Sequence, residues 1–470
     1  MKSWISFFFD FWKTKTGPRL LNVLFLLLIS ASIIRVNASL EGFESLFLFR
    51  ILIFVLCLSL LYRFIRYREL VVNFGDYKNL YPIFFLSGAW ISLSLISYFW
   101  SNSFEDYFRY NVLLGISLAF TLVIAIFVRT EEMLKKIWLV LLVTLVLAIM
   151  VAYLELIFGI RLKGSGLLNA GEGYWLFATS FFNHPNDFAG YLSLSLPFLF
   201  LLPLSKDYGK YRWYIFALAI VVALTLTFTG SKLNYIATIV SSGLALSILL
   251  INKNKEILGY ITLILSVLFM LNPSVGPQTV AFIQSNVLNR ELNAAAIDRI
   301  QGQEIQGSLD EFNQGFGSAE VRKSLIVNGV SVLLTEPTAY VGLLTGVGAG
   351  QVESYMKNFS NTENVRNLHN WWLEVFVNYG IFVGTGYVIL YLFLLYKSVR
   401  MATRSEKNGF LRYFYFSIAL ILVVYSITSV SPSSSIGYAP LWLNLGLAIA
   451  AVSLPPSLYN SNLRNGKKHR

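Results

Sequence analysis

The stretch IWLVLLVTLVLAIMVAYLELIF, residues 137–158, decides the fold, because its first part, 137–154, carries no charge. About 20 apolar residues in a helix cross the roughly 30 Å hydrocarbon core of a bilayer. Runs of this kind recur along the 470 residues, of which 56% are hydrophobic and only 13% are charged. Soluble domains carry about 25% charged residues. The sequence therefore predicts an all-α integral membrane protein.

We predict about twelve transmembrane helices and one large extracytoplasmic loop. The first part of the chain, 1–272, holds an aromatic and basic interfacial segment followed by helices one to nine. The loop occupies 273–370, and the last part, 371–470, holds helices ten to twelve and a basic tail. The expected spans are at about 20–34, 45–62, 80–100, 111–128, 137–158, 188–204, 213–229, 233–251, 257–272, 371–396, 414–430 and 441–455.

Positive charge is concentrated in alternate connectors between these spans. Lysine and arginine are enriched in connectors that face the cytoplasm. The alternation therefore predicts a multi-pass protein of the cytoplasmic membrane with both termini inside and the large loop outside. The net charge of +12 is explained by this topology, and we expect no nucleic-acid partner. The single cysteine, Cys57, excludes an intrachain disulfide.

The large loop ends in Asn367-Leu368-His369-Asn370-Trp371-Trp372. His369 is a candidate general base, since an unperturbed imidazole titrates at a pH of about 6.5. A lone histidine at a helix start is more often a cap or an interfacial residue, so the pattern alone leaves both roles open. Asn370 beside it is a weaker candidate.

A second polar segment, Asn183-His184-Pro185-Asn186-Asp187, precedes the sixth span. His184 and Asn186 are weaker site candidates. Asn186 or Asp187 is expected to cap the helix that follows, since both residue types favour that position.

Four cations at outer helix ends or in the loop need an explanation, because the positive-inside rule sorts such residues to the other side. Lys232 lies in the tight turn Thr229-Gly230-Ser231-Lys232, where it either binds an anion or extends its amine to water. Arg322 is a second anion-binding candidate, with a solvated loop arginine as the alternative. Arg299 and Arg50 are weaker candidates, the first as a surface pair and the second as a snorkelling residue.

The chain offers no recognisable metal or cofactor site. It has no histidine pair at helical spacing, and the Glu105–Asp106 pair has no further ligands in the sequence. The run Gly346-Val347-Gly348-Ala349-Gly350 is expected to be an ordinary turn, because it lacks the strand and helix of a nucleotide-binding loop. We expect no metal and no cofactor.

Four of these segments, in order, resemble the O-antigen ligase/polymerase superfamily. Asn183 to Leu192 is similar to its N-P-N-D-F-A-x-Y-L segment, and Thr229-Gly230-Ser231-Lys232 to its T-G-S-R segment. The stretch from Arg322 to Gly348 is similar to its R…P-x-x-G-x-G segment, and His369-Asn370 begins its H-N-x-x-L-x segment. Within this superfamily, the residues of these segments most resemble those of the teichuronic-acid polymerase branch. The chain departs from the family in Lys232, where arginine is usual.

The resemblance implies a metal-independent GT-C-type glycosyltransferase that takes glycan from undecaprenyl diphosphate at the outer membrane face. Lys232 and Arg322 would hold the diphosphate, and His369 would deprotonate or orient an acceptor sugar hydroxyl. The expected function is polymerisation of lipid-linked repeat units, with polysaccharide-assembly proteins as partners. Two alternatives stay open: a ligase that passes the glycan to a lipid core or a protein, and a transporter of anionic solutes.

Overall fold

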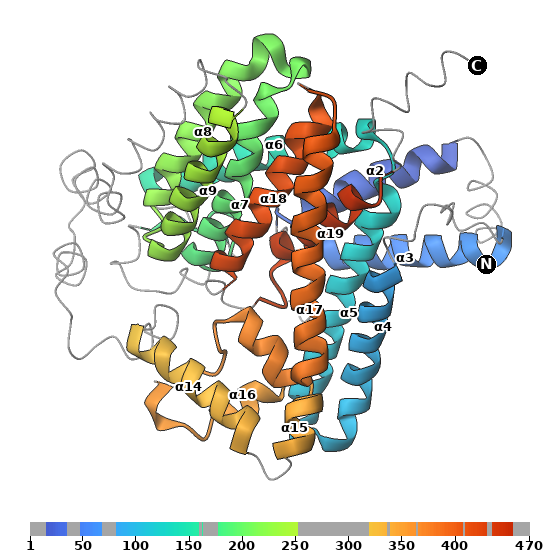
Figure 1. Ribbon diagram of the computed structural model, residues 1–470, viewed down its shortest axis with the longest axis vertical. Coiled ribbons are helices and arrows are strands. Elements are labelled where there is room, and N and C mark those ends of the chain that lie inside the picture. The colour runs from blue at the N-terminus through green and yellow to red at the C-terminus, as the bar shows by residue number, and fades with distance from the viewer. Residues whose placement is uncertain are drawn as a thin grey trace.

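The computed structural model describes residues 16–34, 48–67, 81–158, 162, 177–251, 319–335, 339–362, 365–407, 409–429 and 435–454, and these are almost entirely helical (Figure 1). The principal helices are α2 (Thr16–Ala31), α3 (Leu48–Tyr67), α4 (Tyr81–Ile96), α5 (Phe104–Phe127), α6 (Glu131–Phe158), α7 (Pro185–Leu201), α8 (Arg212–Thr227), α9 (Lys232–Ile251), α14 (Ala319–Thr335), α15 (Ala339–Thr345), α16 (Gln351–Met356), α17 (Trp371–Arg404), α18 (Phe410–Thr428) and α19 (Ala439–Val452).

Seven helical stretches among the described residues are long and apolar enough to cross a membrane: Tyr81–Trp100, Phe104–Phe127, Glu131–Phe158, Pro185–Leu204, Lys206–Thr227, Trp371–Arg404 and Phe410–Thr428. Four shorter apolar helices lie at Leu20–Ala31, Leu48–Tyr62, Lys232–Ile248 and Ala439–Val452. The prediction of a helical membrane protein is confirmed. The count of twelve spans stays a prediction, and the expected span at 257–272 lies outside the described residues.

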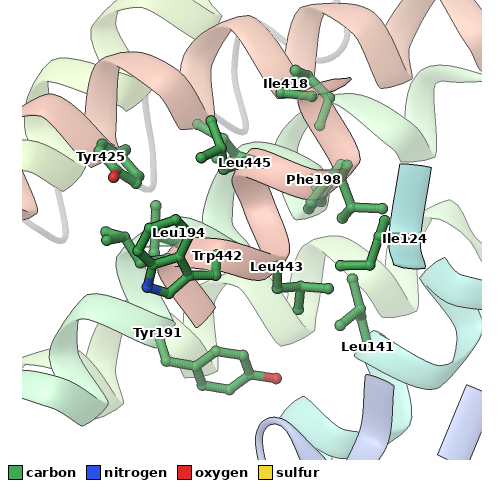
Figure 2. Close-up of a cluster of buried hydrophobic side chains, with 14 of the residues drawn as sticks. Ile124, Leu141, Tyr191, Leu194, Phe198, Ile418, Tyr425, Trp442, Leu443 and Leu445 are labelled. Atoms are coloured by element: carbon green, nitrogen blue, oxygen red, sulfur yellow. The ribbon is translucent and has the colours of Figure 1, made fainter. Parts of the chain in front are cut away.

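Helix α19 forms the centre of the bundle. Every residue from Ala439 to Val452 is buried, as expected of a helix that is apolar all round. Figure 2 shows how its side chains Trp442, Leu443 and Leu445 lie among residues of four other helices: Ile124 of α5, Leu141 of α6, Tyr191, Leu194 and Phe198 of α7, and Ile418 and Tyr425 of α18. The candidate site lies at the end of this bundle where α7 begins and α18 ends.

Several of the basic connectors gather at one end of the bundle, as the connector pattern predicts. Lys135 pairs with Asp207 at 2.5 Å and Lys206 with Glu406 at 2.8 Å, so three basic connectors meet at one end. The opposite end carries α14, α15 and α16 (Figure 1). The side of the membrane that each end faces stays a prediction.

Part of the predicted large loop is a compact helical cap. Residues 273–318 lie outside the described part, but α14, α15 and α16 pack against α17. The apolar segment at 324–334 belongs to this cap. It lies within α14, and Val321, Leu325 and Val332 are buried in a small core with residues of α16 and α17. The segment therefore packs against the bundle through α17.

Candidate active site at the start of four helices

The first part of the site is the start of α7. His184 is the N-cap: its Nδ1 accepts a hydrogen bond from the backbone N–H of Asn186 at 3.2 Å. The expected cap, Asn186 or Asp187, is therefore wrong. Pro185 occupies the first helical position, which suits proline's fixed φ and missing N–H, so the helix begins before Asn186. Asn186 and Asp187 lie buried in its first turn.

The second part is the turn that carries Lys232. Gly230 has a φ of +66° and a side chain there would collide with Phe177, which explains the glycine. The Asn234 side chain donates to Ser231 Oγ at 2.9 Å and to the Asn186 carbonyl at 3.4 Å. These bonds join the starts of α9 and α7. The Lys232 side chain itself is exposed.

Arg322, in the first turn of α14, is only partly exposed. Partial burial lowers the pKa of its guanidinium, although an arginine stays charged at any relevant pH. Burial lowers the pKa of His184, and the charge of Arg322 lowers it further, while Asp187 opposes the shift. His184 is therefore neutral at neutral pH and lies within electrostatic range of Arg322.

His369 lies directly before α17 in the left-handed backbone region, with a φ of +47°. Its backbone N–H donates to Asn367 Oδ1 at 2.8 Å, and Asn370 is the N-cap of α17, accepting from the Leu373 N–H at 3.2 Å. His369 is thus not the cap of α17, so capping does not explain a histidine here. Its side chain is half-buried.

Trp371 anchors this segment in the bundle. It is fully buried, its indole N–H donates to Tyr387 Oη at 3.1 Å, and its ring lies 6.1 Å from that of Trp90 and 5.7 Å from that of Trp442. Its backbone N–H donates to the Ser429 carbonyl at the end of α18, at 3.2 Å. Two residues after His369, the chain is therefore rigidly held.

Helix α14 connects the two halves of the site. At its start Arg322 lies within electrostatic range of His184. Two turns later Gly329 is packed so closely on Leu368 that a Cβ there would lie 3.0 Å from the Leu368 side chain. The contacts therefore gather α7, α9, α14 and the residues before α17 at one end of the bundle. All four helices begin there, and helix N-termini carry partial positive charge. The arrangement is suited to an anion beside a half-buried histidine.

A family model described as O-antigen ligase matches residues 216–388, a range that contains Lys232, Arg322 and His369. The resemblance to the O-antigen ligase family is confirmed. The teichuronic acid biosynthesis protein TuaE of Bacillus subtilis (strain 168) is 25% identical over 421 residues, which cover 88% of this chain and 80% of TuaE. His184 and Asn186 precede the range matched by the O-antigen ligase model but lie against its residues.

The glycine run of the O-antigen ligase segment is more than a surface turn. Helix α17 is interrupted at Gly380, whose φ of +72° is not helical. The carbonyls of Val377 and Asn378 accept instead from the N–H groups of Val347 and Gly348, at 2.8 and 3.1 Å. The turn predicted at 346–350 is present. It supplies donors to carbonyls beside the break in α17, which the sequence did not indicate.

Gly346→Ala is expected to destabilise the protein by more than about 2 kcal/mol. A left-handed conformation alone costs a non-glycine residue roughly 1–2 kcal/mol, and a Cβ at Gly346 would lie 2.3 Å from the backbone of Asn378. The measurement is the thermal unfolding midpoint in detergent. Gly243→Ala is the matched control, because Gly243 has open space around it within α9. The control should unfold at the same or a higher temperature; equal midpoints for Gly346→Ala and wild type would contradict the prediction.

Of the weaker cation candidates, Arg50 is not part of this arrangement. Arg299 lies outside the described residues. Arg50 lines a separate cavity of about 610 Å³, counted with its mouth, between α2, α3, α5 and α19. Among the described residues, no three His, Cys, Asp or Glu side chains are grouped closely enough to hold a metal ion. Asp106 of the Glu105–Asp106 pair faces Arg109 at 3.4 Å instead.

The sequence analysis missed three buried polar residues near the site. Asn234 joins two helix starts, as described above. Glu155 lies within a membrane span, and Glu374 lies one turn after Asn370; both are buried. An ionisable residue inside an apolar span is a signal in itself, so Glu155 was open to recognition from the sequence. The burial of Glu374 depends on tertiary packing and was not.

Proposed function

We propose that this protein polymerises lipid-linked glycan repeat units. The growing glycan leaves undecaprenyl diphosphate and is transferred to a sugar hydroxyl of another lipid-linked unit, at the outer face of the cytoplasmic membrane. The similarity to the O-antigen ligase model and to TuaE supports the reaction class. The observation that carries the assignment is that Arg322 lies within electrostatic range of neutral His184, at the end of the bundle where α7 and α9 begin and where the His369 segment lies.

The proposed chemistry follows from these groups. The acceptor oxygen forms a bond to the anomeric carbon while the bond from that carbon to the diphosphate breaks. The hydroxyl proton passes to His369, and the diphosphate leaves with the bonding electrons. Arg322, Lys232 and the helix N-termini stabilise its developing charge, as fixed positive groups do in such sites. Cations in these positions make a metal ion unnecessary for the departure of the diphosphate.

The position of the site, at a polar end of an otherwise apolar bundle, fits such a donor. Outward-facing side chains of the membrane helices are large and apolar, among them Phe54, Leu139, Phe382 and Ile389, so lipid surrounds the bundle. A polyprenyl tail can therefore remain in the membrane while its diphosphate reaches the polar end of the helices. The cap formed by α14, α15 and α16 leaves the glycan on the aqueous side.

Reconstitution in liposomes with purified lipid-linked repeat units tests the proposal. A ladder of products that lengthen by whole repeat units, with no other acceptor present, is the expected result. Transfer that occurs only after a lipid core or a protein acceptor is added would make the protein a ligase. Movement of the glycan lipid or of an anionic solute without any new glycosidic bond would make it a transporter and refute the enzymatic assignment.

A further inference from the structure

Two buried glutamates in this protein have opposite environments. Glu155 accepts three hydrogen bonds: from the backbone N–H groups of Thr179 and Ser180, at 2.8 and 2.7 Å, and from the Thr179 hydroxyl at 2.9 Å. Several donors stabilise an ionised carboxylate even when it is buried. Glu374 has far less support, with one donor to Oε1, the Tyr110 hydroxyl at 2.9 Å.

Glu374 and Asn378 each have one side-chain oxygen that lacks a hydrogen-bond donor among the described residues. Glu374 Oε2 and Asn378 Oδ1 are both buried, and neither has a hydrogen-bond partner among the residues that the structure describes. The two residues lie one turn apart on α17, where side chains four positions apart are neighbours. Both groups also contact the same hydroxyl, because Asn378 Nδ2 donates to Tyr110 Oη at 3.3 Å. Two buried acceptors without a donor therefore belong to side chains that are one turn apart and bind the same hydroxyl.

We propose that Glu374 is a neutral carboxylic acid whose proton is shared with Asn378 Oδ1. One proton on Oε2 gives both orphaned oxygens a partner and leaves every existing bond to Tyr110 intact. The titratable groups that face this carboxyl are the Tyr110 hydroxyl from α5, the Tyr379 hydroxyl from α17 and the Glu353 carboxylate from α16. None of these groups is a cation. The exposed Arg109 guanidinium pairs with the Glu353 carboxylate.

The shared proton makes Glu374 a positioning residue for the His369 segment. The Glu374 backbone N–H donates to the Asn370 carbonyl at 2.8 Å, and the Asn378 carbonyl receives the N–H of Gly348 from the cap. Ionisation of Glu374 would place a negative charge beside Asn378 Oδ1. This charge would lie between the backbone bond to Asn370 and the backbone bond to Gly348. We therefore expect loss of the proton to loosen the first turns of α17, which directly follow His369.

Infrared spectroscopy of the purified full chain tests the protonation directly and needs no substrate. The wild-type protein should show the carbonyl stretch of a protonated carboxylic acid, shifted by deuteration, and Glu374→Gln should lack it. Glu155→Gln is the matched control and should keep the band. If Glu374→Gln does not fold, Glu374→Asp should move the band to another frequency. A wild-type spectrum without the band at neutral pH would overturn the proposal and favour an ionised Glu374 that accepts from a rotated Asn378 amide.

The positioning role rests on the proposed function and is tested separately. Gln at position 374 can donate to Asn378 Oδ1 and accept from Tyr110, so this variant should keep most of its transfer activity at neutral pH. It should also lack the fall in activity that we expect of the wild type at alkaline pH. A folded but inactive Glu374→Gln protein would overturn the positioning role. Failure of the wild type to transfer glycan would refute the function and leave the infrared result standing.

Discussion

Replacement of His369 by Asn is expected to reduce glycosyl transfer by about 10²- to 10⁴-fold, the usual contribution of a general base, while binding of the lipid-linked donor persists. Asn is the informative replacement because His369 has a positive φ of +47°, and Asn tolerates the left-handed region better than most residues. The backbone and the Asn370 cap should therefore stay in place, so that only the imidazole is lost. The measurement is the rate of product formation at saturating donor, with donor binding measured in parallel.

His369→Ala should show at least the same loss, with some added loss of stability from backbone strain. His469→Ala is the matched control, since His469 lies in the basic tail and has no proposed role in transfer. Transfer by His369→Asn within a few fold of wild type would exclude this residue as the base. His184 would then be the next residue to replace, because it is neutral and within range of Arg322.

Replacement of Arg322 by Ala is expected to lower the turnover rate by about 10²- to 10³-fold, the typical cost of removing one preorganised group that stabilises transition-state charge. The partial burial of its guanidinium makes the effect larger than for a fully solvated cation. Arg322→Lys should recover part of the rate, because lysine keeps the charge but loses the bidentate geometry. The assay should separate kcat from KM, since charge that develops as the diphosphate leaves affects mainly kcat.

Lys323 provides the control for Arg322. It is the next residue of α14 and is exposed, so Lys323→Ala removes the same charge from almost the same place. We expect its activity to stay within about threefold of wild type, because a solvated surface charge contributes little. Equal losses for both variants would indicate a general electrostatic attraction of the anionic donor rather than a specific contact by Arg322.

The sequence predicted the helical membrane fold because a membrane span depends on the composition of its own consecutive residues. It does not depend on contacts with distant parts of the chain. It also indicated the segments at His184, Lys232, Arg322 and His369, which the structure gathers at one end of the bundle. The cap of α7 was predicted wrongly, because propensity favours Asn and Asp, whereas Pro185 starts this helix earlier.

Features that depend on packing between distant segments were not predictable in this way. Glu374 faces Tyr110, which lies more than 260 positions earlier in the chain. The bond from Asn234 to the Asn186 carbonyl, which joins the Lys232 turn to α7, likewise links segments 48 positions apart. Local sequence carries no record of either contact.

The break in α17 at Gly380 has an evolutionary consequence. The cap is attached to the His369 segment through backbone N–H groups of Val347 and Gly348 and backbone carbonyls of Val377 and Asn378. Such bonds are largely indifferent to side-chain identity, provided that the glycines allow the approach. Under the proposed function, the side chains of the cap can therefore change to accommodate a different sugar without displacing His369. A single scaffold could in this way diversify its glycan specificity while conserving its chemistry.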